Sequence, residues 1–246
     1  MPDRPQPDLR RLPVVAIIFD LDGTLIDSAP DIAGALNLLL AEQGRAPLAT
    51  SAIRAMIGDG SAELVRRAFV ATGAALPEDR LGKIVERYID IYARHPVTPG
   101  CVYPGVRETL KALAAAGIRM GLCTNKPARV VTGLLPALNL AHCFGVVCGG
   151  DTLTTRKPDP APLLWALDRL GLPAIEAPAR AVMVGDGRND VLAARAAGVP
   201  VVAVSYGYSR VPAAELGADL VINHFSQLPA ALKRLLLPVS PAEGRR

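Results

Sequence analysis

The segment from Val14 to Thr24, VVAIIFDLDGT, limits the fold more than any other part of the 246-residue chain. An uninterrupted apolar run leads into two carboxylates on alternate positions, Asp20 and Asp22, and then into Gly23. Such a short run is typical of a strand buried on both faces of a parallel sheet. Since a carboxylate inside the sheet would be costly, both aspartates are expected at the edge where open α/β folds bind ligands. An ordinary strand that ends in a solvated Asp-Gly turn is the alternative, and this segment alone does not decide between them.

Strand-like and helix-like patterns alternate through the second half of the chain. Apolar runs that predict strands recur at 118–123, 144–148, 181–184, 199–204 and 219–222. Segments with helical spacing of apolar residues lie between them. This alternation predicts an α/β fold, with a Rossmann-like parallel sheet flanked by helices and joined by right-handed crossovers.

The stretch between the first two strands is different, because it contains no strand-like run. Helical patterns are expected at 28–44, 51–57, 61–70 and about 81–92. At the start of the first helix, Ser28 is the expected N-cap and Asp31 is expected to close a capping box. About seventy residues of helix inside an α/β pattern predict an inserted helical domain.

The expected domain limits follow from this interruption. Residues 1–27 plus 100–246 would form the catalytic core, and residues 28–99 would form an all-helical cap. The ends of the chain, 1–12 and PVSPAEGRR at 238–246, are expected to be loose tails.

Polar residues gather where the predicted strands stop. They are Asp20, Asp22 and Thr24, then Thr124 and Asn125, then Lys157, and finally Asp186, Asn189 and Asp190. Each group alone is compatible with a turn or a helix cap. Together they would meet at one edge of one sheet and could support phosphoryl transfer, which needs a nucleophile, a divalent cation and donors around the phosphoryl oxygens. Clustered carboxylates with oxygen ligation suit Mg²⁺.

Four short motifs carry a family resemblance. In chain order, DLDGT, TN, KP and GDGRND resemble the signature motifs of the haloacid dehalogenase-like hydrolase superfamily. The resemblance extends from Val14 to about Leu237, and the helical insertion is similar to the cap of one branch of that superfamily. Within it, the chain is most similar to bacterial phosphoglycolate phosphatases, through FDLDGTLIDSAPDIAGALN, IGDG, GDGRNDVLAARAAGVP and VSYGY.

The resemblance implies roles for the reacting residues. Asp20 would be the nucleophile that forms an aspartyl-phosphate, and Asp22 would be the general acid and base. Thr124 and Asn125 would bind the phosphoryl group, and Lys157 would offset its charge.

The resemblance also implies a magnesium site. Mg²⁺ would be held by the Asp20 carboxylate, the backbone carbonyl of Asp22 and the Asp186 carboxylate. Asn189 and Asp190 would support the metal site and the neighbouring lysine.

The implied reaction is Mg²⁺-dependent hydrolysis of 2-phosphoglycolate to glycolate and phosphate. A partner for the substrate carboxylate could come from the N–H groups of the turn 58–60, or from Arg54 or Arg66, although each of these arginines is also compatible with a solvated helix face. Arg188 lies closer to the core site in the sequence and is equally compatible with a structural role. A capped phosphatase or phosphomutase for a sugar phosphate, a nucleotide or pyrophosphate remains an alternative, as does a binding module for phosphate or Mg²⁺. A dehalogenase is disfavoured because the dehalogenases of this superfamily lack a carboxylate at the position of Asp22.

Composition narrows the partners and the compartment. The net charge of +4 is spread along the chain without basic runs, which argues against nucleic acid as a partner. No apolar stretch reaches the length of a membrane span, so no membrane partner is expected. The four cysteines show no CxxC spacing, which favours free thiols in the cytoplasm. A small phosphorylated substrate is the expected partner of a monomer or homodimer.

Overall fold

The structure is a computed structural model that describes residues 14–95, 97–98 and 100–236. Both expected tails, 1–12 and 238–246, lie outside these residues. Within the described part, no helix is long and apolar enough to cross a membrane.

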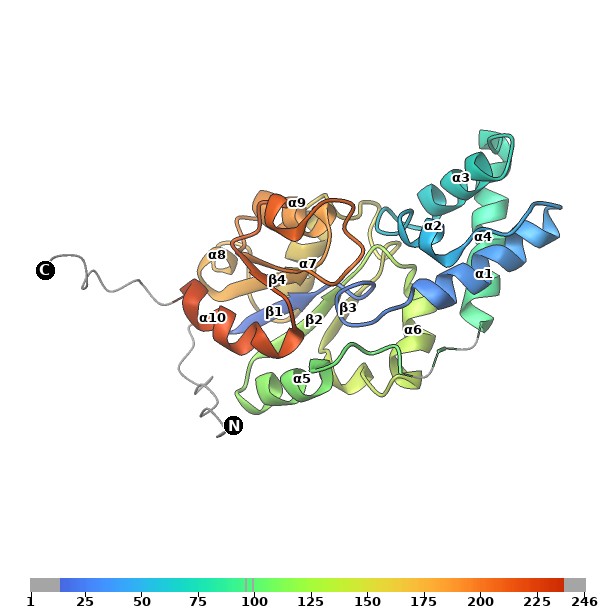
Figure 1. Ribbon diagram of the computed structural model, residues 1–246. Helices are drawn as coiled ribbons and strands as arrows, with labels where there is room; N and C mark the ends of the chain where they lie inside the picture. The colour runs from blue at the N-terminus through green and yellow to red at the C-terminus, as the bar shows by residue number, and fades with distance from the viewer. Residues whose placement is uncertain (1–13, 96, 99, 237–246) are drawn as a thin grey trace, which may run out of the picture.

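A six-stranded parallel sheet forms the centre of the described chain, in the order β3-β2-β1-β4-β5-β6 (Figure 1). The predicted fold class is therefore confirmed. The strands are β1 (Ala16–Phe19), β2 (Arg119–Cys123), β3 (Val146–Cys148), β4 (Ala181–Gly185), β5 (Val201–Val204) and β6 (Leu220–Ile222).

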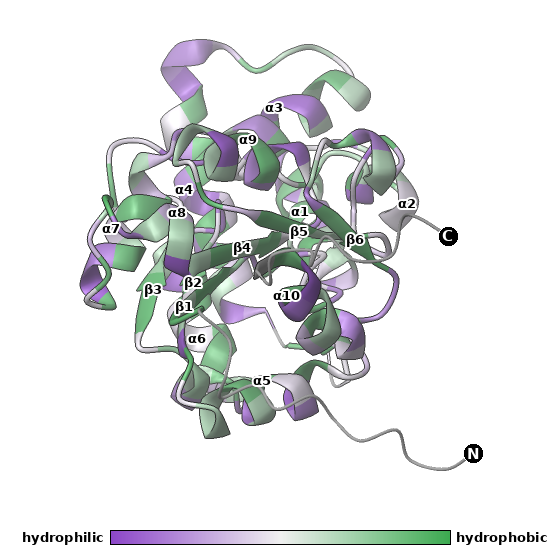
Figure 2. Ribbon diagram, turned by 90° about the vertical axis from the view of Figure 1, so that its left-hand side faces the viewer, coloured by the Kyte–Doolittle hydropathy of each residue, from purple (hydrophilic) through white to green (hydrophobic). Residues whose placement is uncertain are grey.

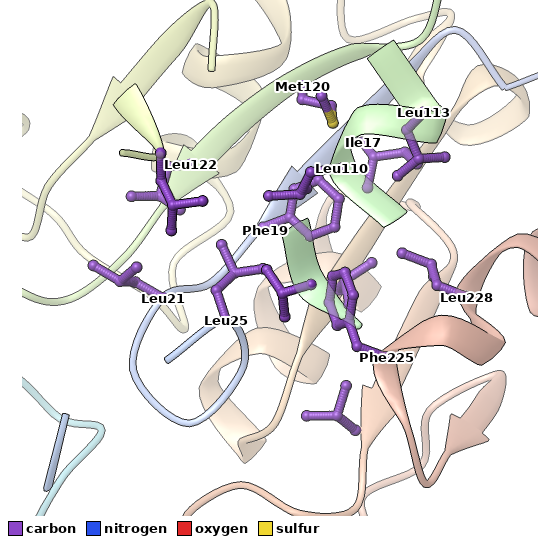
Figure 3. Close-up of a cluster of buried hydrophobic side chains, with 14 of the residues drawn as sticks. Ile17, Phe19, Leu21, Leu25, Leu110, Leu113, Met120, Leu122, Phe225 and Leu228 are labelled. Atoms are coloured by element: carbon purple, nitrogen blue, oxygen red, sulfur yellow. The ribbon is translucent and has the colours of Figure 1, made fainter. Parts of the chain in front are cut away.

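Strand β1 is buried on both faces, as its unbroken apolar run predicts. Ile17 and Phe19 belong to the hydrophobic core on one face, and Ala16 and Ile18 belong to the core on the other. Figure 3 shows the first of these cores, in which the ring of Phe19 packs near that of Phe225 at a centroid distance of 6.0 Å. Because successive side chains of a strand alternate in direction, a sheet covered on both sides requires apolar residues at every position of this strand.

Helices cover both faces of the sheet. On the face of the first core lie α5 (Val106–Ala115), α6 (Ala128–Ala137) and α10 (Leu228–Leu236). On the opposite face lie α7 (Ala161–Arg169), α8 (Ala177–Arg180) and α9 (Arg188–Ala196). Figure 2 shows the hydrophobic strands between these layers. Short 3₁₀ turns complete the core at Ala141–Cys143, Ala213–Glu215 and Phe225–Gln227.

Four helices pack beside this core as a separate unit, which we call the cap. They are α1 (Ala29–Glu42), α2 (Thr50–Arg54), α3 (Ser61–Ala71) and α4 (Glu78–Arg94). The cap has a hydrophobic core of its own, which includes Leu36, Phe69 and Tyr88, and Val130 of α6 joins it. Figure 1 shows the cap beyond one end of the sheet.

The two connections between the cap and the core run side by side. Ile26 of the outgoing connection forms an antiparallel bridge with Val102 of the returning one. The N–H of Asp27 donates to the carbonyl of Cys101 at 2.7 Å, and the N–H of Tyr103 donates to the carbonyl of Leu25 at 3.0 Å. These bonds hold the outgoing and returning segments together as one paired strip.

The capping box expected at the start of α1 is wrong. Ser28 is the N-cap residue, but its side chain makes no capping hydrogen bond. Its hydroxyl donates instead to Asp22 Oδ1 at 2.5 Å, while the carboxylate of Asp31 accepts from the N–H of Thr98. An N-cap serine would use its oxygen as an acceptor for a backbone N–H, whereas here the hydroxyl is oriented to donate to Asp22.

Candidate active site

Three carboxylates meet at the carboxyl edge of the sheet. Asp20 follows β1, Asp186 follows the neighbouring strand β4, and Asp190 lies in the first turn of α9. One oxygen from each lies within 4.8 Å of one from each of the others. Asp186 and Asp190 are buried, and the side chain of Asp20 is 13% exposed.

Burial makes the charges of this cluster costly. It raises the pKa of Asp20 to about 6, against the lowering effect of Lys157 and with a raising effect from Asp190 and Asp22. Burial also raises the pKa of Asp186 well above its usual value, and the charges of Asp190 and Asp20 add to that shift. A divalent cation among these oxygens would offset the repulsion, so the donor set fits a hard cation such as Mg²⁺.

Lys157 is the ammonium that faces the cluster. Its Nζ lies 2.9 Å from Asp20 Oδ1 and 2.6 Å from Asp190 Oδ1. Burial alone would lower the pKa of this lysine, but the charges of Asp190 and Asp20 outweigh that effect and raise it. The second oxygen of Asp190 accepts from the N–H of Gly187 at 3.0 Å, so Asp190 is held from two sides. Lys157 therefore stays charged beside Asp20.

Asp186 is oriented by the loops around it. Its Oδ1 accepts from the hydroxyl of Thr24 at 3.1 Å, and its Oδ2 accepts from the N–H of Tyr208 at 2.6 Å. Gly23 passes so close that a Cβ there would lie 2.4 Å from Asp186 Oδ2. The glycine of the DGT motif is thus what allows the first strand end to approach this carboxylate.

The side chain of Asp22 has different partners. Its Oδ1 and Oδ2 lie 2.9 and 3.1 Å from Lys126 Nζ, and its Oδ1 also accepts from Ser28. The Lys126 side chain is 2% exposed, and its ammonium also contacts the hydroxyl of Tyr92 from the cap helix α4. Sequence reasoning missed Lys126 and Tyr92. The available signal was a lysine directly after the Thr-Asn pair that ends β2.

Thr124 and Asn125 lie at the end of β2, and both are buried. The hydroxyl of Thr124 accepts from the N–H of Lys126 at 3.3 Å. The amide of Asn125 donates to the carbonyls of Lys157 and Gly58, at 2.9 and 3.0 Å. Asn125 therefore connects two core loops with the cap.

All eight predicted site residues line one cavity of about 350 Å³. They are Asp20, Asp22, Thr124, Asn125, Lys157, Asp186, Asn189 and Asp190. The cavity lies between the core and the cap, since cap residues such as Ile57, Tyr88 and Tyr92 line its other side. The convergence expected from the strand ends is therefore present.

Asn189 contacts the cap rather than the carboxylates. Its amide donates to the carbonyl of Gly58 at 3.1 Å and to Asp59 Oδ1 at 2.7 Å. Nearby, Arg210 Nε donates to the carbonyl of Ala55 at 2.7 Å. These bonds hold the cap turn 58–60 against the core.

Of the arginines considered for the substrate carboxylate, the two cap residues Arg54 and Arg66 do not line the cavity, whereas Arg188 does. Arg54 pairs with Asp27 at 2.9 Å, and Arg66 pairs with Glu78 at 2.7 Å. The cavity is lined instead by Arg188 and Arg210, together with the two buried lysines. The cations near the cavity are therefore not the ones that the cap sequence suggested.

Comparison with known proteins agrees with this geometry. The family model described as "haloacid dehalogenase-like hydrolase" matches residues 14–198. The chain belongs to this family. It is 49% identical to a phosphoglycolate phosphatase of Rhodospirillum rubrum, over 87% of this chain and 88% of that protein. It is 43% identical to one of Caulobacter vibrioides, over 89% of this chain and 91% of that protein.

The fold is also similar to solved structures. A crystal structure from Haemophilus somnus, described as a "predicted phosphoglycolate phosphatase", superposes with a TM-score of 0.82 at 32% identity. The superposition covers 90% of this chain and 99% of the other chain. The haloacid dehalogenase-like hydrolases are thus related to this chain in sequence and in fold.

Proposed function

We propose that the protein is a phosphatase that hydrolyses 2-phosphoglycolate to glycolate and phosphate through an aspartyl-phosphate on Asp20. The observation that carries the proposal is the position of Asp20, which lines the cavity 2.9 Å from Lys157 Nζ and in one carboxylate cluster with Asp186. The names of the relatives support the choice of substrate.

The first step transfers the phosphoryl group to the protein. A carboxylate oxygen of Asp20 attacks phosphorus while the bond from phosphorus to the alcohol oxygen breaks. Asp22 gives a proton to that leaving oxygen, which departs as the hydroxyl of glycolate. Lys157 offsets negative charge between the nucleophile and the phosphoryl oxygens, and the Thr124 hydroxyl and the backbone N–H of Asn125 hold those oxygens.

The second step releases phosphate. Asp22, now without its proton, takes one from a water molecule as that water attacks phosphorus. The bond from phosphorus to Asp20 breaks, and the Asp20 carboxylate is restored. The contacts of the cap with Asn125 and Asn189 keep bulk water out of the cavity during both steps.

The cluster of Asp20, Asp186 and Asp190 suits Mg²⁺. In this proposal the carboxylates of Asp20 and Asp186 and the backbone carbonyl of Asp22 hold the ion, and Asp190 supports Lys157. When bound, the ion would neutralise charge on the phosphoryl oxygens and align them with the nucleophile.

We further infer that the chain acts in the cytoplasm, as a monomer or homodimer with residues 28–99 as its cap. Its four cysteines are free, and three of them are buried, which supports a reducing compartment.

A phosphate-release assay tests the reaction. Wild-type protein with Mg²⁺ should give its highest kcat/KM on 2-phosphoglycolate within a panel of sugar phosphates, nucleotides and pyrophosphate, and chelation should abolish release. Asp20→Asn should lose at least about a thousandfold in rate while remaining folded, because the nucleophile is gone. Equal turnover of all esters would remove the substrate claim, and native turnover by folded Asp20→Asn would remove the mechanism.

A further inference from the structure

Lys126 is a buried cation on the leaving-group side of the cavity. Its ammonium directs its donors to the two oxygens of Asp22 and to the hydroxyl of Tyr92, whose ring centroid lies 4.4 Å from Nζ. A lysine ammonium has three N–H donors, so these contacts use all of them. Of the two buried lysines at the cavity, Lys157 faces the nucleophile, and Lys126 faces the acid-base residue.

In the proposed reaction Asp22 exchanges a proton with the leaving oxygen, so one of its oxygens faces the substrate. When that oxygen turns away from Lys126, the ammonium keeps one contact with Asp22 and directs one N–H into the cavity. A buried ammonium with an unpartnered donor is costly, so this donor needs a new acceptor.

The substrate brings such an acceptor to this place. In 2-phosphoglycolate the carboxylate is attached to the carbon that carries the leaving oxygen, which keeps the two groups about 3 Å apart by bond geometry. A donor that contacts the Asp22 oxygen serving the leaving group lies within two hydrogen-bond lengths, about 6 Å, of the leaving oxygen. Lys126 contacts Asp22 and lines the same cavity, so a turn of its flexible side chain brings the ammonium within reach of the substrate carboxylate.

We propose that Lys126 is the specificity-determining residue that binds the carboxylate of the substrate next to its leaving oxygen. This inference rests on the proposed function. The carboxylate takes the donor that Asp22 gives up, and the buried ammonium keeps a counter-charge throughout the reaction. Tyr92 extends the subsite into the cap, so carboxylate binding and cap closure involve the same ammonium.

The other cations at the cavity are placed less well for this role. Lys157 is engaged by Asp20 and Asp190. Arg188 and Arg210 are exposed, and Arg210 is bonded to the carbonyl of Ala55. Among the described residues, Lys126 is the cation in contact with Asp22.

The test compares two phosphate esters whose leaving oxygen is the same kind of primary alcohol oxygen. 2-Phosphoglycolate carries a carboxylate where 2-hydroxyethyl phosphate carries a hydroxymethyl group. The ratio of their kcat/KM values therefore measures the contribution of the carboxylate. In Lys126→Met this ratio should fall at least about 30-fold from the wild-type value, because one partner of a buried charge pair is lost. Lys126→Arg, which keeps the charge, should retain most of the preference. Arg66→Met, outside the cavity, serves as the control and should leave the ratio unchanged, and Arg188→Met tests the competing cation in the cavity lining.

Binding provides a second readout without turnover. In an Asp20→Asn background, calorimetry should show that adding Lys126→Met weakens the binding of 2-phosphoglycolate by a factor similar to the fall in the kcat/KM ratio. The affinity for 2-hydroxyethyl phosphate should not change. If thermal denaturation shows that Lys126→Met is unfolded, Lys126→Gln replaces it, since the amide can still bond Asp22 and Tyr92.

Two outcomes would overturn the inference while the proposed function stands. One is an equal loss on both esters in the Lys126 variants, which would mean that the lysine acts only by orienting Asp22. The other is collapse of the ratio in Arg188→Met with the Lys126 variants unaffected. A wild-type protein without any preference for 2-phosphoglycolate would instead overturn the proposed function itself.

Discussion

At the scale of single residues, Lys157 shows how strongly one buried charge can affect the stability of the fold. It is 3% exposed and contacts both Asp20 and Asp190. Lys157→Met should lower the free energy of unfolding by about 3–5 kcal/mol, because it leaves two buried carboxylates without their cation. Urea denaturation in the absence of divalent ions measures this loss.

The matched control for Lys157→Met is a double variant. Lys157→Met with Asp190→Asn removes one of the stranded charges and should recover part of the lost stability. If Lys157→Met had the same unfolding midpoint as the wild type, the contacts of Lys157 with Asp20 and Asp190 would contribute nothing to stability.

Asp27, at the base of the cap, gives a pH dependence. Burial opposes ionisation, but hydrogen bonds from Tyr208 and Arg54 outweigh it and lower the pKa of this carboxyl below its usual value. A lowered pKa in the folded state stabilises the fold above the unfolded-state pKa, about 3.9, and this stabilisation is lost as the pH falls through the folded-state value.

Thermal denaturation of the wild type and Asp27→Asn checks this dependence. The wild type should have the higher Tm near neutral pH, and the difference between the two proteins should shrink once the pH drops below about 4. A difference that stays constant through this range would show that the carboxylate charge contributes nothing.

How far single residues could be predicted depended on where their signals lie. Asp20 and Asp186 stand at the ends of apolar runs, which placed them at one edge of the sheet, and Lys157 was placed there from its position beyond the third predicted strand. Lys126 looked like an ordinary helix start, and Tyr92 lies at a position whose apolar spacing suits the cap core. Their contact joins residues 34 apart in the chain, and only the packing of α4 against the core creates it.

At the scale of elements, the turn after β1 depends on a glycine. Gly23 has φ +81°, and a Cβ there would lie 2.4 Å from Asp186 Oδ2. Gly23→Ala should therefore displace Asp186 and reduce phosphate release by at least about tenfold, beyond the cost of about 1 kcal/mol for a strained backbone.

Gly44 is the matched control for this turn. It has φ +66°, and nothing lies within 4 Å of a Cβ built there. Gly44→Ala should carry the backbone cost alone and keep full activity. Equal activity of both variants would show that the close approach of Gly23 to Asp186 does not matter.

The strands were predicted well, whereas the hydrogen bonding at the start of α1 was not, and the physical reason is the same. A strand buried on both faces needs an unbroken apolar run, and β1 has one. A helix cap is decided by whichever acceptor is nearest in space, and for Ser28 that acceptor is Asp22, which no local pattern around the helix reveals.

At the scale of the whole molecule, Asn189 joins the two parts of the chain. It bonds Gly58 and Asp59 across the cavity. Asn189→Ala should weaken closure of the cap and raise KM several-fold with little change in Tm, because the lost bonds are partly exposed. Steady-state kinetics on 2-phosphoglycolate measures both parameters.

Asn37→Ala provides the comparison for Asn189→Ala. The Asn37 amide bonds the backbone of Leu48 inside the cap, at 2.9 Å in both directions. Its loss should lower the stability of the cap without raising KM. A similar rise of KM in both variants would mean that cap stability, rather than cap closure, controls binding.

The insertion of a helical unit could be inferred from the absence of strands between β1 and β2. How that unit sits on the core could not, because the decisive contacts join Gly58 to Asn125 and Asn189, far along the chain. Arg54 and Arg66 illustrate the limit, since their sequence position near the 58–60 turn said nothing about the partners that they reach.

The paired strip formed by Ile26 and Val102 has a consequence for evolution. Because the chain leaves the core and returns to it at adjacent points, the whole helical unit is a module that another insertion could replace without disturbing the sheet. The carboxylates and Lys157 belong to the part that would remain. New substrates could then be acquired by exchanging the module, while the phosphoryl chemistry is inherited unchanged.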